Sequence, residues 1–269
     1  MNFIQGNQID FNSLSRFNCG YNTEAILYRD DNNFYKFYRN IHSEKVKRKF
    51  FKLLILNDGV PLKNVIVPDT LIVNKELLLG CRMDYIEYSL PLFRFTSVSD
   101  SVNKFLNMIY DVSFTLREIH GDSRDIVVGD LNFNNIIFDS DFNHYFVDFD
   151  GSMVDGIGAD RIPSMFHLYL KNHGIYKYDI NRDTDKLCMM LNTLYMIFSK
   201  RIDLVTMDEY DEKTERLETL RNMREFVLKI KRCNNRIPVV PYLDELISSN
   251  DFATRNKIKK VNVKVKNIR

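Results

Sequence analysis

The sequence has few cysteines, no long apolar run and no excess of charge of one sign. Its four cysteines, Cys19, Cys81, Cys188 and Cys233, are scattered without the close pairs that hold metals, so we expect reduced thiols. No apolar stretch approaches the roughly 18 residues that a membrane span requires. Met1 is not followed by a basic segment and then an apolar one, so we expect a cytoplasmic protein.

Charge is balanced over most of the chain. The 38 Lys and Arg residues against 36 Asp and Glu residues give a formal net charge of +2, which argues against nucleic acid as the main partner. The C-terminal end differs, because residues 255–269 contain several lysines and no acidic side chain. We expect a solvated tail there, and contact with an anionic partner is the alternative.

The most informative stretch runs from Ile126 to Gly151. Short β-rich segments at 126–128, 136–138 and 145–147 alternate with polar residues, and the Asp and Asn residues between 139 and 143 are typical of a turn. A β-hairpin is therefore predicted from the second of these segments to the third.

Three polar side chains flank this predicted hairpin. Asp130 and Asn135 precede its first strand and Asp148 follows its second, so closure of the hairpin brings all three to one edge. Carboxylate and amide oxygens suit Mg²⁺, which prefers hard oxygen ligands and often shares them with substrate phosphates. The alternative is that these residues only form turns, as Asp and Asn side chains commonly do.

The pattern D-x-x-x-x-N at Asp130–Asn135, followed by Asp148-Phe149-Asp150, resembles the protein-kinase-like superfamily, whose members carry D-x-x-x-x-N and then D-F-G. The resemblance implies an α+β, bilobal fold. It places a small β-rich N-lobe with one helix at residues 1–84 and a larger, mainly helical C-lobe at residues 85–254. The basic tail at residues 255–269 follows.

The resemblance also implies a nucleotide-binding side in the N-lobe. Residues 17–38 have the pattern of a β-hairpin around a polar turn at 30–33. Lys36 on the second strand would pair with the α- and β-phosphates of ATP, and Gly20 is the only glycine of the expected lid loop. Without the resemblance, Lys36 would be interpreted as an edge-strand charge that limits aggregation.

A helix is predicted over residues 43–56, with Ser43 as its N-cap and an apolar stripe set against its basic residues. The superfamily's helix at this place presents a Glu to the strand lysine, and Glu44 is the only Glu available. The alternative role of Glu44 is to compensate the helix dipole.

Two further β-rich runs are predicted at residues 64–73 and 76–86. By the resemblance, the second leads into a hinge between lobes, where Met83 would line the back of an adenine pocket. The backbone of Asp84 and Ile86 would then face the base. The alternative is that Met83 simply fills the core, as a Met at a strand end commonly does.

Helical spacing of apolar residues continues through the second half of the chain. The superfamily has an Asp that orders the catalytic loop at the start of one of these helices, and Asp183 and Asp185 both fit; either could instead compensate the helix dipole. His120 is predicted to have a structural role. The helices are predicted at residues 101–120, 183–198, 212–231 and 243–247.

Together these features imply a kinase that uses ATP and Mg²⁺. By the resemblance, Asp130 would accept the proton of the acceptor hydroxyl, Asn135 and Asp148 would hold Mg²⁺, and Lys36 would neutralise phosphate charge. We expect a Ser or Thr hydroxyl of a protein as acceptor, because the glycine-containing segment 151–158 suits an extended peptide.

Departures from the pattern leave two other functions open. Val128-Gly129 stands where protein kinases carry His-Arg, and the run through Asn132 is more similar to aminoglycoside and choline kinases. A small hydroxyl compound bearing amines is therefore an alternative acceptor, and Asp150, Asp155 and Asp160 would supply an acidic pocket for it. The other alternative is a pseudokinase that binds or scaffolds without turnover, which the single glycine of the lid favours.

Overall fold

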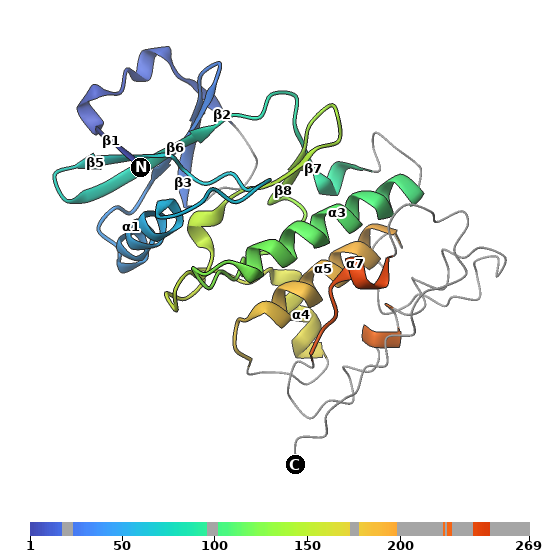
Figure 1. Cartoon of the computed structure of the whole chain (residues 1–269). Coiled ribbons are helices and arrows are strands. Elements are labelled where there is room, and N and C mark those ends of the chain that lie inside the picture. Colours follow the sequence, from blue (N-terminus) through green and yellow to red (C-terminus); the bar gives the residue numbers. More distant parts are fainter. Residues whose placement is uncertain are drawn as a thin grey trace.

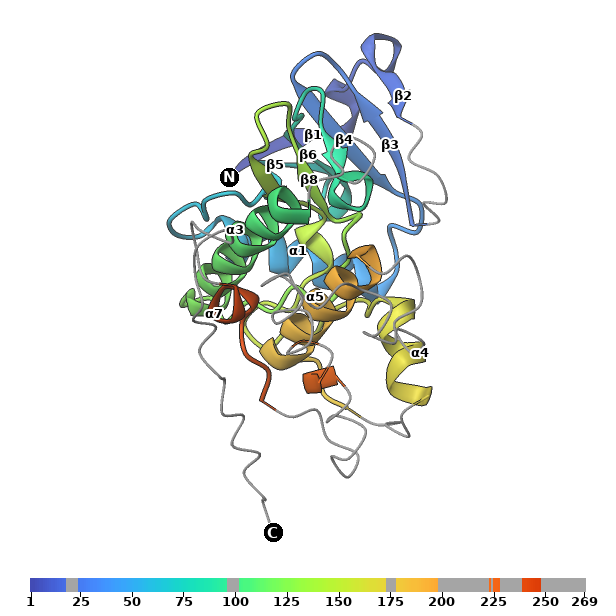
Figure 2. The same cartoon turned by 90° about the vertical axis from the view of Figure 1, so that its right-hand side faces the viewer.

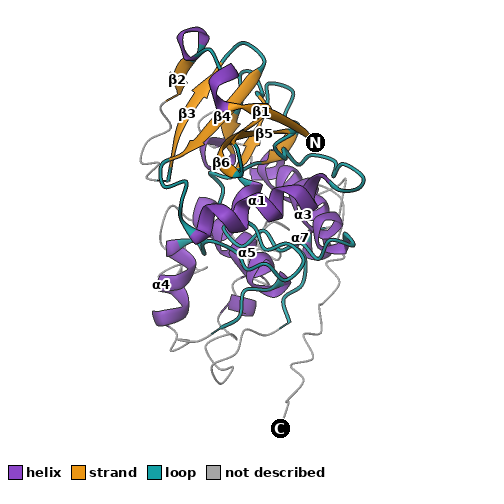
Figure 3. Ribbon diagram, turned by 90° about the vertical axis from the view of Figure 1, so that its left-hand side faces the viewer, coloured by secondary structure: helices purple, strands orange, loops and turns teal. Residues whose placement is uncertain are grey.

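The computed structural model describes residues 1–17, 24–95, 102–172, 178–197, 223, 225–227 and 239–247. Over these residues the protein is a mixed α/β structure, in which a six-stranded sheet and one helix come first and mostly helices follow (Figure 1; Figure 3). The sheet has the spatial order β1-β5-β6-β4-β3-β2. Its strands are β1 (Asn2–Gln5), β2 (Ser15–Phe17), β3 (Ala25–Arg29), β4 (Asn33–Tyr38), β5 (Thr70–Asn74) and β6 (Leu77–Asp84).

The hairpin of β3 and β4 forms as predicted because Asp30 organises its turn. The Asp30 carboxylate accepts hydrogen bonds from the backbone N–H groups of Asn32 at 2.9 Å and Asn33 at 2.7 Å. The Asp30 N–H in turn donates to the Asn33 carbonyl at 3.1 Å. This local closure fixes the register that places Lys36 opposite Leu27 on one side and Cys81 on the other.

Helix α1 (Glu44–Asn57) begins where predicted, because the Ser43 hydroxyl accepts a hydrogen bond from the Val46 N–H at 3.3 Å. Its buried face contains Leu53 and other apolar side chains, and it also contains Lys49 and Lys52. The expectation that the basic residues of this helix all lie on the solvent side is therefore wrong. These two lysines point toward the segment that follows the hairpin at 136–147.

The second part of the chain combines a small sheet with a group of helices. Helix α3 (Val102–Gly121) contacts α5 (Arg182–Ile197) and α7 (Leu243–Leu246), and the three lie side by side (Figure 1; Figure 2). The predicted apolar face of α3 is buried from Phe105 to Ile119. The remaining elements are β7 (Leu90–Pro91), β8 (Ile136–Phe138), β9 (His144–Phe146) and α4 (Ser164–Asn172), with β7, β8 and β9 forming one antiparallel sheet.

Three predicted or missed strands differ from the sequence expectation. The run at 64–73 becomes a strand only from Thr70 onward, after Pro68, which has no N–H to donate to a ladder. The segment 126–128 makes a single bridge, Val127 to Met153, instead of a strand. Strand β1, which the sequence pattern did not indicate, is parallel to β5 and is defined by that distant pairing.

Several expectations fall on residues that the structure does not describe. The lid turn with Gly20 and the tail at 255–269 lie outside the described residues. The helix predicted at 212–231 is described only at Met223 and 225–227, which are helical. Within the described part of the chain, no helix combines the length and apolar character needed to cross a membrane.

Candidate active site

The loop that carries Asp130 is shaped by a glycine and closed by an amide. Gly129 has φ of +74°, and a Cβ there would lie 2.6 Å from the Ala159 Cβ, so no larger residue fits without a shift. The Asn135 side chain donates from Nδ2 to the Asp130 carbonyl at 2.9 Å. Asn132 Nδ2 donates to the Asp130 carboxylate at 3.2 Å. The loop is therefore held in one compact conformation in front of β8.

Asp185, on the first turn of α5, holds the backbone of the Asp130 loop. Its carboxylate accepts hydrogen bonds from the backbone N–H groups of Val128 at 2.7 Å and Gly129 at 2.9 Å. His120 Nε2 lies 3.0 Å from the same carboxylate, and His120 Nδ1 lies 2.9 Å from the Tyr242 hydroxyl. His120 thus has the structural position that was predicted for it.

Of the two Asp residues that could order the loop, only Asp185 contacts it. Asp183 accepts instead from the Val240 N–H at 3.0 Å and pairs with Lys186 at 2.6 Å. The two residues lie in the same helical turn but point to different neighbours, which the sequence alone could not distinguish.

The hairpin of β8 and β9 forms as predicted and delivers Asp148 next to Asn135. The Val147 N–H donates to the Asn135 carbonyl at 2.9 Å, so Asn135 and Asp148 flank the same end of the hairpin. Asp148 has a left-handed backbone, with φ of 68° and ψ of 32°. This conformation has an energetic cost for a non-glycine residue, and residues strained in this way tend to cluster at functional sites.

Lys36 of β4 contacts two carboxylates of the segment after the hairpin. Its Nζ pairs with Asp148 Oδ1 at 2.5 Å and with Asp150 Oδ1 at 2.8 Å and Oδ2 at 3.0 Å. The Asp148 side chain remains 44% exposed, whereas that of Asp150 is 2% exposed. Lys36 is buried and is no edge-strand charge, since β4 lies between β6 and β3.

Of the two roles open to Glu44, the structure shows the one at the start of the helix and not the pairing with Lys36. Glu44 is 78% exposed and pairs with Lys47 at 2.6 Å, three residues along the same helix. It stands in the first turn of α1, where a carboxylate favours the positive end of the helix. The buried carboxylate partner of Lys36 is Asp150, two residues after Asp148, and not a Glu of α1.

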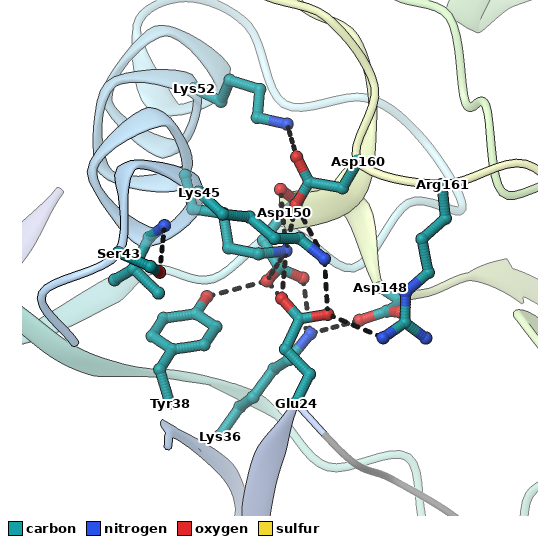
Figure 4. A network of polar contacts seen from close by, with 12 residues as sticks. Glu24, Lys36, Tyr38, Ser43, Lys45, Lys52, Asp148, Asp150, Asp160 and Arg161 are labelled. Atoms are coloured by element: carbon teal, nitrogen blue, oxygen red, sulfur yellow. Dashed lines mark hydrogen bonds and ion pairs between the residues drawn. The ribbon is translucent and has the colours of Figure 1, made fainter. Parts of the chain in front are cut away.

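Two lysines of α1 extend this cluster, which is called the lysine network below and comprises Lys36, Lys49, Lys52, Asp150 and Asp160 (Figure 4). Lys49 Nζ lies 2.8 Å from Asp150 Oδ2 and 2.7 Å from Asp160 Oδ2. Lys52 Nζ pairs with Asp160 Oδ1 at 2.9 Å and donates to the carbonyl of Ser152 at 2.8 Å.

Sequence reasoning missed Lys49 and Lys52 because lysine is expected on a solvated face. The pattern that could have found them is their spacing, since Lys45, Lys49 and Lys52 recur at i, i+4 and i+7 and so share one face of the helix. At the edge of the network, Glu24 joins these lysines to a further cation. Its carboxylate pairs with Lys45 at 3.1 Å, Lys49 at 3.0 Å and Arg161 at 3.4 Å.

The charges of this region support one another. Burial opposes ionisation of Asp150, but Lys36 and Lys49 hold its pKa well below the ordinary range. Burial also opposes the charge of Lys36, yet Asp148 and Asp150 raise the pKa of its ammonium group well above the ordinary value. Partial loss of hydration and the neighbouring Asp150 carboxylate raise the pKa of Asp148, although the Lys36 ammonium group opposes that rise. Asp148 is therefore the weaker acid of the pair.

A magnesium site at Asn135 and Asp148 would consist of two protein ligands. Neither Asn135 Oδ1 nor Asp148 Oδ2 has a hydrogen-bond or ion-pair partner among the described residues, so both oxygens are available. No group of three or more His, Cys, Asp or Glu side chains in the described part of the chain is arranged to hold a metal. The donor set fits Mg²⁺ bound through one carboxylate with substrate phosphates and water, which is its common mode.

The residues predicted to face an adenine base lie at the end of β6 and just beyond it. Met83 is buried opposite Phe34 of β4 and belongs to the core. Asp84 is the last residue of β6, and the Ile86 carbonyl accepts a hydrogen bond from the Ser89 hydroxyl at 2.8 Å. Met83 therefore has the core position that was given as its alternative role.

A pocket of about 470 Å³ opens beside Asp130. Its walls include Asn132 and Phe133 from the same loop, Phe93, and Tyr195 of α5. Arg161 also lines it and connects it to the lysine network through Glu24. Among the described residues that line the pocket, Asp130 is the one carboxylate and Arg161 the one cation.

Comparison of the chain with models of protein families finds no match, and comparison with curated protein sequences finds none either. Function must therefore be inferred from the chemistry of the site itself.

Proposed function

We propose that the protein is an ATP-dependent phosphotransferase with a bilobal, protein-kinase-like fold. The observation that carries this proposal is the convergence of Lys36 from the sheet with Asp148 from the turn after the hairpin, next to Asn135 and the Asp130 loop. Phosphoryl transfer needs positioning and charge stabilisation more than covalent catalysis, and these four side chains supply both.

Each residue then has a defined role. Lys36 would neutralise the α- and β-phosphates, and Asn135 and Asp148 would hold Mg²⁺, which neutralises the charge of the phosphates when bound. Asp130 lines the open pocket and would orient the acceptor hydroxyl and take up its proton. Asp185 keeps the backbone of the Asp130 loop in place.

The acceptor that we favour is a Ser or Thr hydroxyl of a protein. A small acceptor bearing several amines would need an acidic pocket, for which the sequence offered Asp150, Asp155 and Asp160. Asp150 and Asp160 are instead neutralised by buried lysines, and none of the three lines the pocket beside Asp130. This distribution of charge argues against an aminoglycoside-like acceptor, while a small acceptor without amines stays an alternative.

The test is incubation of the protein with labelled ATP and Mg²⁺, together with a mixed protein extract or, separately, a panel of amino alcohols and aminoglycosides. We expect label in protein, lost in Asp130→Asn. The matched control is Asp141→Asn, which should keep full activity. Asp141 is an exposed carboxylate in the turn between β8 and β9.

The other outcomes are equally informative. Label confined to the small-molecule fraction would select the small-molecule kinase. An ATP-induced rise in melting temperature without any transfer would select the pseudokinase, and absence of ATP binding would overturn the proposal.

A further inference from the structure

The helix that borders the Lys36 site presents a lysine to it instead of a carboxylate. Lys49 projects from α1 to Asp150, and its Nζ lies 2.8 Å from Asp150 Oδ2 and 3.3 Å from the Asp150 carbonyl. Both side chains are 2% exposed. A buried lysine here would be costly unless a carboxylate compensated it, so Lys49 and Asp150 depend on each other.

Asp150 is the most fully coordinated carboxylate of the site. It accepts from Lys36 with both oxygens, from Lys49, and from the Tyr38 hydroxyl at 2.8 Å. Asp148 differs, because its side chain is largely open and Lys36 is its one hydrogen-bond partner in the described part of the chain. Asp150 is thus buried and held by several partners, whereas Asp148 is exposed and could bind another partner.

We propose that Asp150 is the positioning residue that holds Lys36 in place when Asp148 is used elsewhere, and that Lys49 keeps Asp150 in that role. The inference rests on the proposed function, in which Asp148 would help to hold Mg²⁺. Asp150 then retains Lys36 through two contacts, and Tyr38 and Lys49 fix the Asp150 carboxylate in turn.

The count of charges supports this division. The residues joined by ion pairs in this region are five cations, Lys36, Lys45, Lys49, Lys52 and Arg161, and four carboxylates, Glu24, Asp148, Asp150 and Asp160, which leaves one net positive charge. A net positive charge beside the sheet favours a phosphate group, and it would be larger if Asp148 were engaged by a metal instead of by Lys36. Position and charge therefore both assign the anchoring task to Asp150.

The experiment compares the binding of adenosine, ADP and ATP, each with Mg²⁺, to the parent and to Asp150→Asn, by calorimetry. An anchor of Lys36 affects only ligands with phosphates. We expect the dissociation constants of ADP and ATP to rise at least tenfold, on the order of one lost charge contact, while that of adenosine stays unchanged. Lys49→Met should produce the same selective loss with a smaller factor.

Lys52→Met is the matched control. Lys52 is equally buried on the same helix, but it pairs with Asp160 and the Ser152 carbonyl and does not contact Asp150. This variant should lower the melting temperature without changing the ratio of adenosine affinity to ATP affinity. If Asp150→Asn does not fold, as judged by circular dichroism, Lys49→Met carries the test.

Two results would overturn the inference while leaving the proposed function in place. One is equal loss of adenosine and ATP binding, which would indicate general disruption, and the other is unchanged ATP binding in both variants. Failure of the parent to bind any of the three ligands would overturn the proposed function and the inference with it.

Discussion

The described part of the chain contains two buried polar clusters that are built differently. The lysine network contains three ammonium groups and two carboxylates that come from the sheet, α1 and the segment at 150–160. The second cluster, called the Asp185 cluster, has one central carboxylate that accepts from two backbone N–H groups and contacts one imidazole. The first is rich in full charges, and the second is mainly a set of hydrogen bonds to backbone.

The difference indicates different tasks. The Asp185 carboxylate accepts from two backbone N–H groups whose positions are set by the chain. The Asp185 cluster therefore fixes the loop and has no side-chain partner at the loop to release. Full charges with several partners can change partners when an ion or a phosphate arrives, and Asp148 at the open edge of the lysine network is placed to do so. Substitutions of Asp148 or Asp150 should therefore change binding, and substitutions in the Asp185 cluster should mainly change stability.

The largest effect is expected at Asp148. Asp148→Ala should abolish the rise in melting temperature that ATP and Mg²⁺ together produce, because it removes the carboxylate that would hold the metal. Asp130→Ala should retain most of that rise, since Asp130 would act on the acceptor in the proposed function. The measurement is a thermal shift with and without ATP and Mg²⁺, and equal shifts in both variants and the parent would contradict the division of roles.

In the Asp185 cluster, Asp185→Ala should lower the free energy of unfolding by about 3–5 kcal/mol, as is typical when one partner of a buried polar set is removed. Denaturant unfolding measures this. Asp183→Ala is the matched control in the same helical turn, and because Asp183 is more exposed it should lose about 1 kcal/mol. A loss for Asp183→Ala as large as that for Asp185→Ala would show that the loop is not held as described.

His144 lies in neither cluster. It is a buried titratable group whose hydrogen-bond partners are uncharged, so it contrasts with the charged groups of the lysine network. It is buried between Thr115 at 2.8 Å and Asn64 at 3.3 Å, and burial, with repulsion from Lys63, lowers its pKa to about 4. The unfolded chain then binds a proton more readily than the folded protein. Stability should therefore fall by about 2–3 kcal/mol as the pH drops from 6.5 to 4.

The measurement is the free energy of unfolding against pH for the parent and His144→Gln. The variant should show a shallower fall over this window, whatever its stability at pH 7. Identical slopes for the two proteins would mean that His144 is not the group responsible.

Activity should not require phosphorylation of the segment between Asp150 and Pro163. Gly129 cannot pair with a phosphorylated residue, and Asp160 is already held by Lys49 and Lys52. The Ser152 hydroxyl is buried and donates to the Phe149 carbonyl at 2.6 Å, so Ser152→Ala should cost only about 1 kcal/mol of stability. A large loss of rate in this variant, restored by Ser152→Asp, would contradict the expectation.

The smallest effect is expected for Glu44→Gln. Glu44 is exposed and contacts Lys47 alone among the described side chains, so the KM for ATP should not change. A small decrease in melting temperature is expected from the loss of a carboxylate at the start of α1. A raised KM for ATP would return Glu44 to the role that the sequence first suggested.

Local patterns predicted much of the secondary structure. The hairpin at β3 and β4, the N-cap of α1, the hairpin at β8 and β9 and the long helices α3 and α5 follow from turn chemistry and apolar spacing. Strand β1 was missed because its partner residues in β5 lie 68 positions away in the chain, and no local pattern specifies such a pairing.

The site was predicted less completely than the elements that carry it. Motif spacing predicted Asp130, Asn135, Asp148 and Lys36 as site residues, and the structure brings Lys36 and Asp148 together. The burial of Lys49 and the capture of Lys36 by Asp150 depend on how α1 packs against the segment after the hairpin. That contact joins residues about 100 positions apart, so it belongs to tertiary structure and leaves no trace in hydrophobic periodicity.

The left-handed backbone of Asp148 has a consequence for engineering. Glycine adopts such a conformation freely, whereas a residue with a Cβ does so at a cost of roughly 1–3 kcal/mol. A selection for heat resistance alone would thus be expected to accept glycine at position 148 and to discard the carboxylate. If Asp148 has the proposed role, thermostable variants of this chain should be selected for stability and for nucleotide binding together, because stability and metal binding would compete at this one residue.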